Sequence, residues 1–157
     1  MKKYIITAVF SVFSIISLSA QSKKDAQVTK LYQNYIAIKS ALASDDADKT
    51  SKAATEFIKT ASAIDVKSVS EGNLNILRKD ATAISEARSI NAQRETFYNL
   101  SDNMIALTKE FKLSENPIYV QYCPMADGNW LSDESKIVNP YYGKSMLSCG
   151  NVKSTIK

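Results

Sequence analysis

The stretch FYNLSDNMIALTKEF, residues 97–111, carries the clearest structural signal in the chain. Its large apolar side chains recur at steps of three and four residues, at Phe97, Leu100, Met104, Leu107 and Phe111. This period places all five side chains on one face of an α-helix. The stretch therefore predicts an amphipathic helix that buries one side.

Three similar stripes precede this one along the chain. Between Gln21 and Asn116 the sequence contains no proline and one glycine, Gly72, so little interrupts helix formation there. The apolar periodicity predicts helices over residues 25–43, 46–64, 72–88 and 91–112. Four amphipathic helices of similar length with short connections predict an antiparallel four-helix bundle over residues 21–113.

Side chains that commonly cap helices stand at the expected starts. Asp45 and Asp46 precede the second predicted helix, and Ser70 precedes the third. Ser89 or Asn91 stands where the fourth begins. Such side chains accept hydrogen bonds from the free backbone N–H groups of the first turn, so they support the predicted helix starts.

Residues 114–157 differ in character from the rest. All three prolines and the other three glycines lie here, which indicates turns and short strands. The expected elements are a strand in PIYVQYC (117–123), a turn in DGN (127–129), strand pieces near 135–138 and 151–156, and a turn in NPYYG (139–143). The predicted fold class is therefore mainly α, a four-helix antiparallel bundle with a short C-terminal Cys/Met-containing β/loop segment packed on it.

The N-terminus is typical of an exported protein. Lys2 and Lys3 precede an apolar run over residues 4–18, and the small residue Ala20 follows. A charged start, a short apolar run and a small residue at the cut are typical of a secretory signal peptide. We predict a bacterial signal peptide over residues 1–20, cleaved after Ala20, and a periplasmic or secreted protein with no membrane span after cleavage.

Charge and composition exclude several function classes. Without Lys2 and Lys3 the chain carries 18 basic and 16 acidic residues, and no basic cluster stands out, so no nucleic-acid partner is expected. Histidine is absent from all 157 residues. This excludes histidine-based general base catalysis and the common histidine-rich zinc sites, and we expect no enzyme.

Four sulfur-bearing residues stand out in the C-terminal segment. Cys123 and Met125 are two residues apart, and Met146 and Cys149 are three apart. In a strand and a tight turn, respectively, each pair would project to one side. Two thiols and two thioethers brought together would favour Cu(I) or another soft metal over magnesium or calcium.

The same residues allow two other interpretations. In an exported protein two cysteines usually pair, and a Cys123–Cys149 disulfide would leave Met125 and Met146 as core filler. The two thiols can also be free and buried. Residue spacing alone leaves all three possibilities open.

The stretch YCPMADGNWLSDESKIVNPYYGKSMLSCGNV, residues 122–152, resembles the exported bacterial family known only as domain of unknown function 3347. It is also similar to C-terminal parts of some periplasmic adaptor subunits of heavy-metal efflux systems. The resemblance implies metal handling by association, and the assignment of Cys123, Met125, Met146 and Cys149 as ligands is a hypothesis. The resemblance further implies that the loop geometry is set by Trp130, Asn139, Pro140, Tyr141 and Gly143.

Together these observations predict an exported soft-metal binding protein. The metal expected is copper, as Cu(I), and the role expected is that of a carrier or accessory to heavy-metal efflux. The alternative is a structural or interaction module without metal, in which a Cys123–Cys149 disulfide shapes a surface. In that case the partner is another envelope protein, such as an efflux adaptor.

Overall fold

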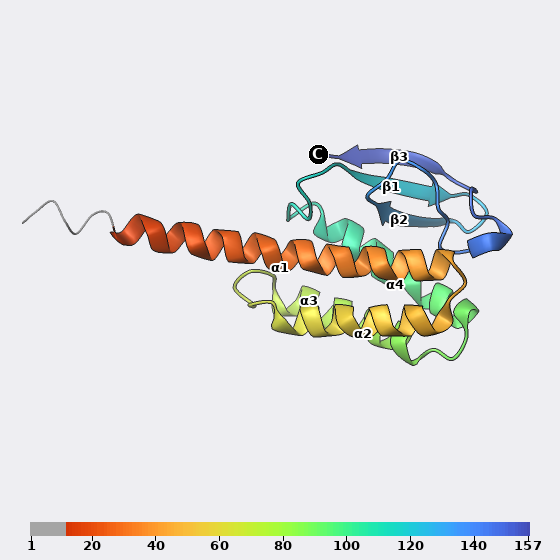
Figure 1. Cartoon of the computed structure of the whole chain (residues 1–157), viewed down its shortest axis with the longest axis horizontal. Helices are drawn as coiled ribbons and strands as arrows, with labels where there is room; N and C mark the ends of the chain where they lie inside the picture. Colours follow the sequence, from red (N-terminus) through yellow and green to blue (C-terminus); the bar gives the residue numbers. More distant parts are fainter. Residues whose placement is uncertain (1–11) are drawn as a thin grey trace, which may run out of the picture.

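Four helices form the larger part of the molecule (Figure 1). The computed structural model describes residues 12–157, with side chains from residue 26 onward. The helices are α1 (Val12–Ala43), α2 (Ala47–Ala63), α3 (Glu71–Glu86) and α4 (Ile90–Leu107). Each helix packs on the next, and α4 also contacts α1. The predicted fold class, mainly α with a C-terminal β segment, is confirmed.

The starts of α2, α3 and α4 are fixed by side-chain caps. Asp46, Ser70 and Ser89 each accept a hydrogen bond from the backbone N–H three residues on, at 2.9, 3.3 and 3.2 Å. These bonds satisfy donors that have no partner within the helix. The cap predictions are therefore confirmed at these three residues, whereas Asp45 has another role, described below.

Two helix boundaries differ from the prediction. Helix α1 begins at Val12 rather than near residue 25 and runs past Ala20, while residues 1–11 of the predicted signal peptide lie outside the described residues. Helix α4 ends at Leu107 rather than 112. The amides that follow it bond to carbonyls three residues back, as Lys109 N–H does to Ala106 at 3.1 Å, and this tighter turn ends the regular helix.

No helix in the described part of the chain, residues 12–157, is long and apolar enough to cross a membrane.

The apolar stripes predicted from sequence meet in the centre of the bundle. Phe97, Leu100, Met104 and Leu107 of α4 are buried, and Phe111, beyond the end of the helix, packs against the core while partly exposed. The apolar residues at the same spacing in α1, α2 and α3 are buried as well: Val28, Leu31, Tyr35, Ile38 and Leu42, then Ala54, Phe57 and Ala61, then Leu74, Leu77, Ala81 and Ile84. Burial of these side chains supplies the main driving force for packing the helices.

A three-stranded antiparallel sheet covers the α1 and α4 side of the bundle. Its strands are β1 (Ile118–Cys123), β2 (Gly128–Ser132) and β3 (Asn151–Ile156), in the order β2-β1-β3. Strand β2 contacts α4 and α1, and β3 lies farthest from the helices (Figure 1). The predicted strands at 118–123 and 151–156 therefore form.

The strand predicted near residues 135–138 does not form. Residues 133–139 instead cross the sheet as an irregular loop. The buried Gln121 amide donates to the carbonyls of Glu134 and Lys136, at 2.8 and 3.2 Å. Because a side chain occupies these carbonyls, they are not engaged in strand pairing.

Aromatic side chains join the sheet to the bundle. The Tyr35 hydroxyl accepts a hydrogen bond from Leu131 N–H at 3.0 Å and pairs with the Ser101 hydroxyl at 2.7 Å. The Tyr35 ring stacks on Phe97, which contacts Tyr141. Trp130 and Tyr141 are buried, whereas Leu147 is 40% exposed.

Arg94 and Asp45 hold the NPYYG turn against the α1–α2 connection. The Arg94 guanidinium donates to the carbonyls of Pro140 and Leu42 at 2.9 and 2.8 Å and pairs with the Asp45 carboxylate. Asp45 also accepts a hydrogen bond from Lys144 N–H at 3.1 Å. Asp45 therefore anchors the C-terminal segment instead of capping α2.

Gly143 lies directly over this anchor and adopts φ +54°. A Cβ atom there would collide with the Asp45 carboxylate and the Arg94 guanidinium. Glycine is therefore required both by the backbone conformation and by the space available.

We expect Gly143→Ala to lower the free energy of unfolding by about 1–3 kcal/mol, because it adds backbone strain and displaces the Arg94–Asp45 pair. Gly72→Ala is the matched control, since a Cβ atom at Gly72 meets nothing within 4 Å and lies in α3. That variant should be neutral or stabilising by up to about 1 kcal/mol. Urea unfolding of both variants checks the prediction, and equal stability of the two would contradict it.

Candidate functional site

Cys123 and Cys149 meet at one end of the sheet. Their Sγ atoms lie 3.1 Å apart, and both cysteines are free. This distance exceeds the roughly 2.05 Å of a disulfide bond and brings the two thiols into direct contact. Cys123 is the last residue of β1 and is fully buried, whereas Cys149 is half-buried and follows the turn after η1 (Gly143–Ser145). We call these two residues the dithiol.

The β1–β2 turn directs backbone donors at the dithiol. The N–H groups of Met125 and Ala126 donate to the Cys123 sulfur. The Tyr98 and Tyr142 hydroxyls donate to the carbonyls of Ala126 and Met125 at 3.0 and 3.1 Å. Because phenols hold these two carbonyls, the turn keeps its N–H groups pointed at the sulfur.

Asn139 joins the dithiol to the NPYYG turn. Its buried amide group donates to the Cys149 carbonyl at 2.9 Å and to the Cys123 sulfur. Its side-chain oxygen accepts from Tyr141 N–H at 2.8 Å and Tyr142 N–H at 3.3 Å. One buried side chain therefore holds both cysteines and the turn between them.

Trp130 and Tyr141 pack against each other, and Trp130 also lies against the chain next to Cys149. The Tyr141 hydroxyl donates to the Asn129 carbonyl at 2.6 Å, and its ring lies edge-on to Trp130 at 5.9 Å. At Gly150, which has φ +138°, a Cβ atom would lie 3.0 Å from the Trp130 ring. These contacts place the chain beside Cys149 close to the ring.

The surroundings of the dithiol distinguish its two thiols electrostatically. Burial raises the pKa of Cys123, but the hydrogen bonds from Cys149, Ala126, Asn139 and Met125 outweigh burial and lower the pKa overall. The pKa of Cys149 is raised, chiefly because its thiol donates to Cys123. The first proton is therefore lost from Cys123, and Cys149 keeps the second.

The structure brings together two of the four sulfurs predicted as ligands. The Met125 side chain is 64% exposed and that of Met146 is partly exposed. Both methionines contact the cysteines through backbone atoms: Met125 N–H reaches both sulfurs, and the Met146 carbonyl accepts from Cys149 N–H at 3.0 Å. Among residues 26–157, whose side chains are described, no group of three or more His, Cys, Asp or Glu could hold a metal ion.

The residues named as shaping the loop have distinct positions. Asn139 and Pro140 make direct hydrogen bonds to other parts of the protein. Trp130 and Tyr141 are buried. Gly143 adopts a positive φ. Arg94 and Tyr98, which hold the C-terminal segment from α4, were not predicted from the sequence. Both lie on the helix beside the apolar stripe, where a polar side chain usually faces water.

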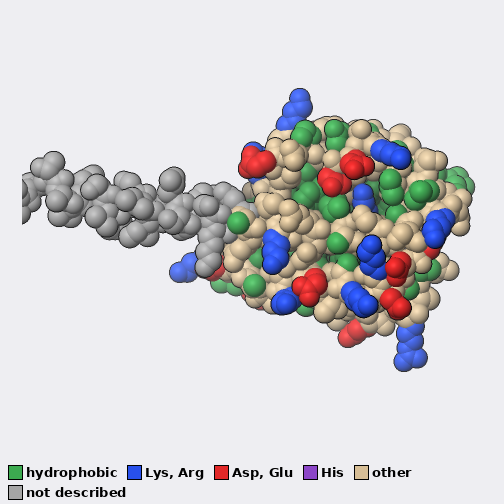
Figure 2. Space-filling model, in the orientation of Figure 1, with side chains coloured by type: hydrophobic (Ala, Val, Ile, Leu, Met, Phe, Trp, Pro, Cys, Tyr) green, Lys and Arg blue, Asp and Glu red, His purple; other side chains and the backbone are tan. Residues whose placement is uncertain are grey.

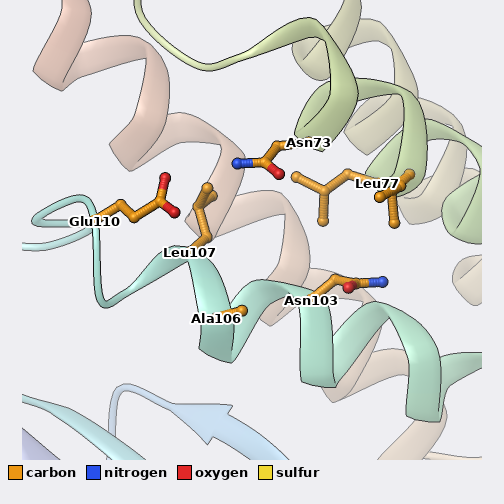
Figure 3. Close-up of a pocket in the computed structure, with 7 residues that line it drawn as sticks. Asn73, Leu77, Asn103, Ala106, Leu107 and Glu110 are labelled. Atoms are coloured by element: carbon orange, nitrogen blue, oxygen red, sulfur yellow. The ribbon is translucent and has the colours of Figure 1, made fainter.

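A small pocket between the start of α3 and the end of α4 lies away from the dithiol (Figure 3). Its volume is about 70 Å³, and its lining includes Asn73, Leu77 and Asn103. The Asn103 amide donates to the buried Asp80 carboxylate at 2.7 Å. This bond satisfies the buried carboxylate, so the pocket is explained by packing between the two helices.

The pKa directions predict a stability maximum for the reduced protein. Because the pKa of Cys123 is lower in the folded protein, the free energy of unfolding rises with pH from that lowered pKa up to the ordinary thiol pKa. Because the pKa of Cys149 is higher in the folded protein, the free energy of unfolding falls as the pH rises from the ordinary thiol pKa to that raised pKa. The test is urea unfolding under reductant between about pH 7 and pH 10.5. The free energy of unfolding of the wild type minus that of Cys123→Ser/Cys149→Ser should pass through this maximum. A difference that does not vary with pH would contradict the prediction.

Comparison with known proteins gives one match. The model of the family described as "Protein of unknown function (DUF3347)" matches residues 31–116. This range covers most of the helical bundle and ends before β1 and the dithiol. No curated protein and no solved structure matches the chain. Because the matched residues make up more than half of the sequence, the chain belongs to the DUF3347 family.

Proposed function

We propose that the protein binds a soft metal ion, Cu(I), through the dithiol of Cys123 and Cys149. The observation that carries this proposal is the 3.1 Å contact between the two sulfurs, one of which is held as a preferred thiolate. Thiolates are the protein ligands that soft metals prefer. Metal binding requires deprotonated thiols, so a lowered pKa at Cys123 favours binding near neutral pH.

The small number of side-chain ligands at the dithiol also favours Cu(I), which accepts few ligands, over zinc. Structural zinc sites normally use four protein ligands, and the described residues offer no third cysteine, histidine or carboxylate at the dithiol. The exposed thioether of Met125 is two residues from Cys123. We infer that this side chain turns toward the dithiol on metal binding and supplies a third sulfur ligand.

Binding would require the two sulfurs to separate. Metal–thiolate bonds of about 2.3 Å place two sulfurs roughly 3.8 Å apart at a tetrahedral angle and about 4.6 Å apart in a linear site. Cys123 is fixed at the end of β1, whereas Cys149 lies in a half-buried turn. We therefore expect Cys149 to move when the ion binds, and its exposure gives the ion a route from solvent.

The proposed role is that of a carrier or accessory to heavy-metal efflux in the bacterial envelope. It is supported by the similarity of residues 122–152 to segments of periplasmic efflux adaptors and by the signal peptide predicted over residues 1–20. An adaptor subunit is the partner that this role implies. The exposed position of Met125 would allow the ion to pass to a partner's sulfur ligands.

A competition titration tests metal binding. Reduced protein, residues 21–157, is titrated with Cu(I) against a chelator, and we expect one ion per chain. The double variant Cys123→Ser/Cys149→Ser should lose this binding. Met125→Leu should weaken it roughly tenfold, about 1.4 kcal/mol, and Met146→Leu tests the fourth predicted sulfur. Failure of the reduced wild type to compete with the chelator would overturn the proposal.

The contact between the Cys123 and Cys149 sulfurs also favours a second candidate function. In this alternative the protein is a structural or interaction module closed by a disulfide. The two sulfurs need to approach by only about 1 Å to reach bonding distance. The bond would close a loop of about 25 residues and stabilise the folded state by roughly 3 kcal/mol. The partner would again be an envelope protein.

Oxidation of the purified protein tests this candidate. We expect a mass loss of about two hydrogens and protection of both cysteines from alkylation, since the pair closes on itself. The free energy of unfolding should rise by about 3 kcal/mol, measured with and without reductant. An unchanged or lower stability after oxidation would argue against a structural disulfide.

A further inference from the structure

The two cysteines of the dithiol differ in access to solvent. Cys123 is fully buried, and it is held by Asn139 and by the N–H groups of the β1–β2 turn. Cys149 is half-buried and comes from a turn. Its sulfur is therefore the one that an external reactant can reach, while the Cys123 sulfur lies directly behind it at 3.1 Å.

Exposed apolar side chains gather in the sequence around these cysteines. Met125, Leu147 and Val152 are 64%, 40% and 39% exposed, and each lies within three residues of Cys123 or Cys149. Figure 2 shows charges of both signs scattered over one face of the molecule, with hydrophobic side chains between them. We call Met125, Leu147 and Val152 the apolar rim of the dithiol.

We propose that the dithiol exchanges disulfides with cysteine-bearing polypeptides, with Cys149 forming the mixed disulfide and Cys123 resolving it. This activity goes beyond metal binding and does not depend on it. A thiol with partial access to solvent, in contact with a buried second thiol, suits a two-step exchange through a mixed disulfide.

Oxidation of the dithiol takes two displacement steps. The Cys149 proton passes along the S···S contact to Cys123, and the Cys149 thiolate attacks a disulfide R–S–S–R in the polypeptide. A Cys149–S–S–R bond forms, and the first R–S⁻ leaves and takes the proton from Cys123. The Cys123 thiolate then attacks the Cys149 sulfur and displaces the second R–S⁻, which is protonated by water. The protein gains one disulfide, and the polypeptide disulfide is reduced to two thiols.

The reverse reaction uses the same atoms. A polypeptide thiolate attacks the half-buried Cys149 sulfur, and Cys123 leaves as a thiolate that accepts hydrogen bonds from Met125, Ala126 and Asn139. These donors are in place before the bond breaks. A second polypeptide thiolate then attacks the polypeptide sulfur of the mixed disulfide, which forms the polypeptide disulfide and releases Cys149 as a thiolate. The direction of net transfer is set by the redox state of the polypeptide, which is the co-reactant in both directions.

The apolar rim favours a polypeptide over a small polar thiol such as glutathione. Exposed apolar side chains beside a reactive group offer contact area to the side chains that flank a cysteine in a peptide. Strand β3, which carries Val152, is also the outer strand of the sheet and is exposed along its length. An extended segment can pair with such an edge.

Trapping experiments test which sulfur reacts. Metal-free protein in a chelator is mixed with the disulfide of a cysteine-bearing apolar peptide, quenched with acid at intervals and mapped by mass spectrometry. Cys123→Ser should accumulate a mixed disulfide on Cys149, and Cys149→Ser should form one on Cys123 at least about tenfold more slowly, because that sulfur is buried. Wild-type protein should release two peptide thiols per chain and end with a Cys123–Cys149 disulfide.

Two outcomes would overturn the proposal. In wild-type protein, a mixed disulfide found mainly on Cys123 would contradict the assigned order, and no release of peptide thiol would exclude exchange. Because the wild type is mapped directly, the result does not depend on the folding of either variant. Because the exchange assay uses metal-free protein in a chelator, its result is independent of Cu(I) binding.

A second comparison tests the polypeptide preference. Leu147→Ser/Val152→Ser should slow exchange with the apolar peptide several-fold and leave exchange with glutathione disulfide unchanged. Val66→Ser, which removes an apolar side chain that is 55% exposed in the α2–α3 connection, is the matched control and should change neither rate. Equal slowing with both disulfides, or no slowing, would overturn the assignment of a polypeptide substrate.

Discussion

The buried amide of Asn139 is the interaction on which the C-terminal segment depends. Its nitrogen donates to the Cys149 carbonyl and the Cys123 sulfur, and its oxygen accepts from the backbone of Tyr141 and Tyr142. A buried polar group that loses such partners costs roughly 1–3 kcal/mol. The same side chain therefore orders the turn and holds the two cysteines in contact, so that loop geometry and thiol chemistry cannot vary independently.

The helical bundle provides a rigid platform for this segment. Tyr35 reaches from α1 to the backbone of β2, and Arg94 reaches from α4 to Pro140 and to the end of α1. Both side chains make their bonds in or beside the core, where hydrogen bonds are little weakened by water. The sheet has three short strands and a small core of its own, so it relies on these contacts for its position.

The metal-bound and disulfide states proposed above would use the same two sulfur atoms as the free dithiol. In the structure the sulfurs are 3.1 Å apart, between the separation in a disulfide and the separation around a bound ion. Small movements of the Cys149 turn would convert one state into another, while Cys123 stays fixed on β1. The proposed metal binding and the proposed disulfide exchange would therefore compete for one reduced pair. The family match ends at residue 116, so it describes the platform rather than this chemistry.

The sequence by itself determined the helices, their caps at Asp46, Ser70 and Ser89, and the turn-rich character of residues 114–157. These features follow from local periodicity and from bonds between residues three or four apart. It also indicated Cys123, Met125, Met146 and Cys149 as a group, but not that the cysteines would be in contact while Met125 faces solvent. Only the tertiary structure decided that contact and the roles of Arg94, Asp45 and Tyr98. The bonds of these residues join positions far apart in the chain, and no local pattern records which distant carbonyl a polar side chain will meet.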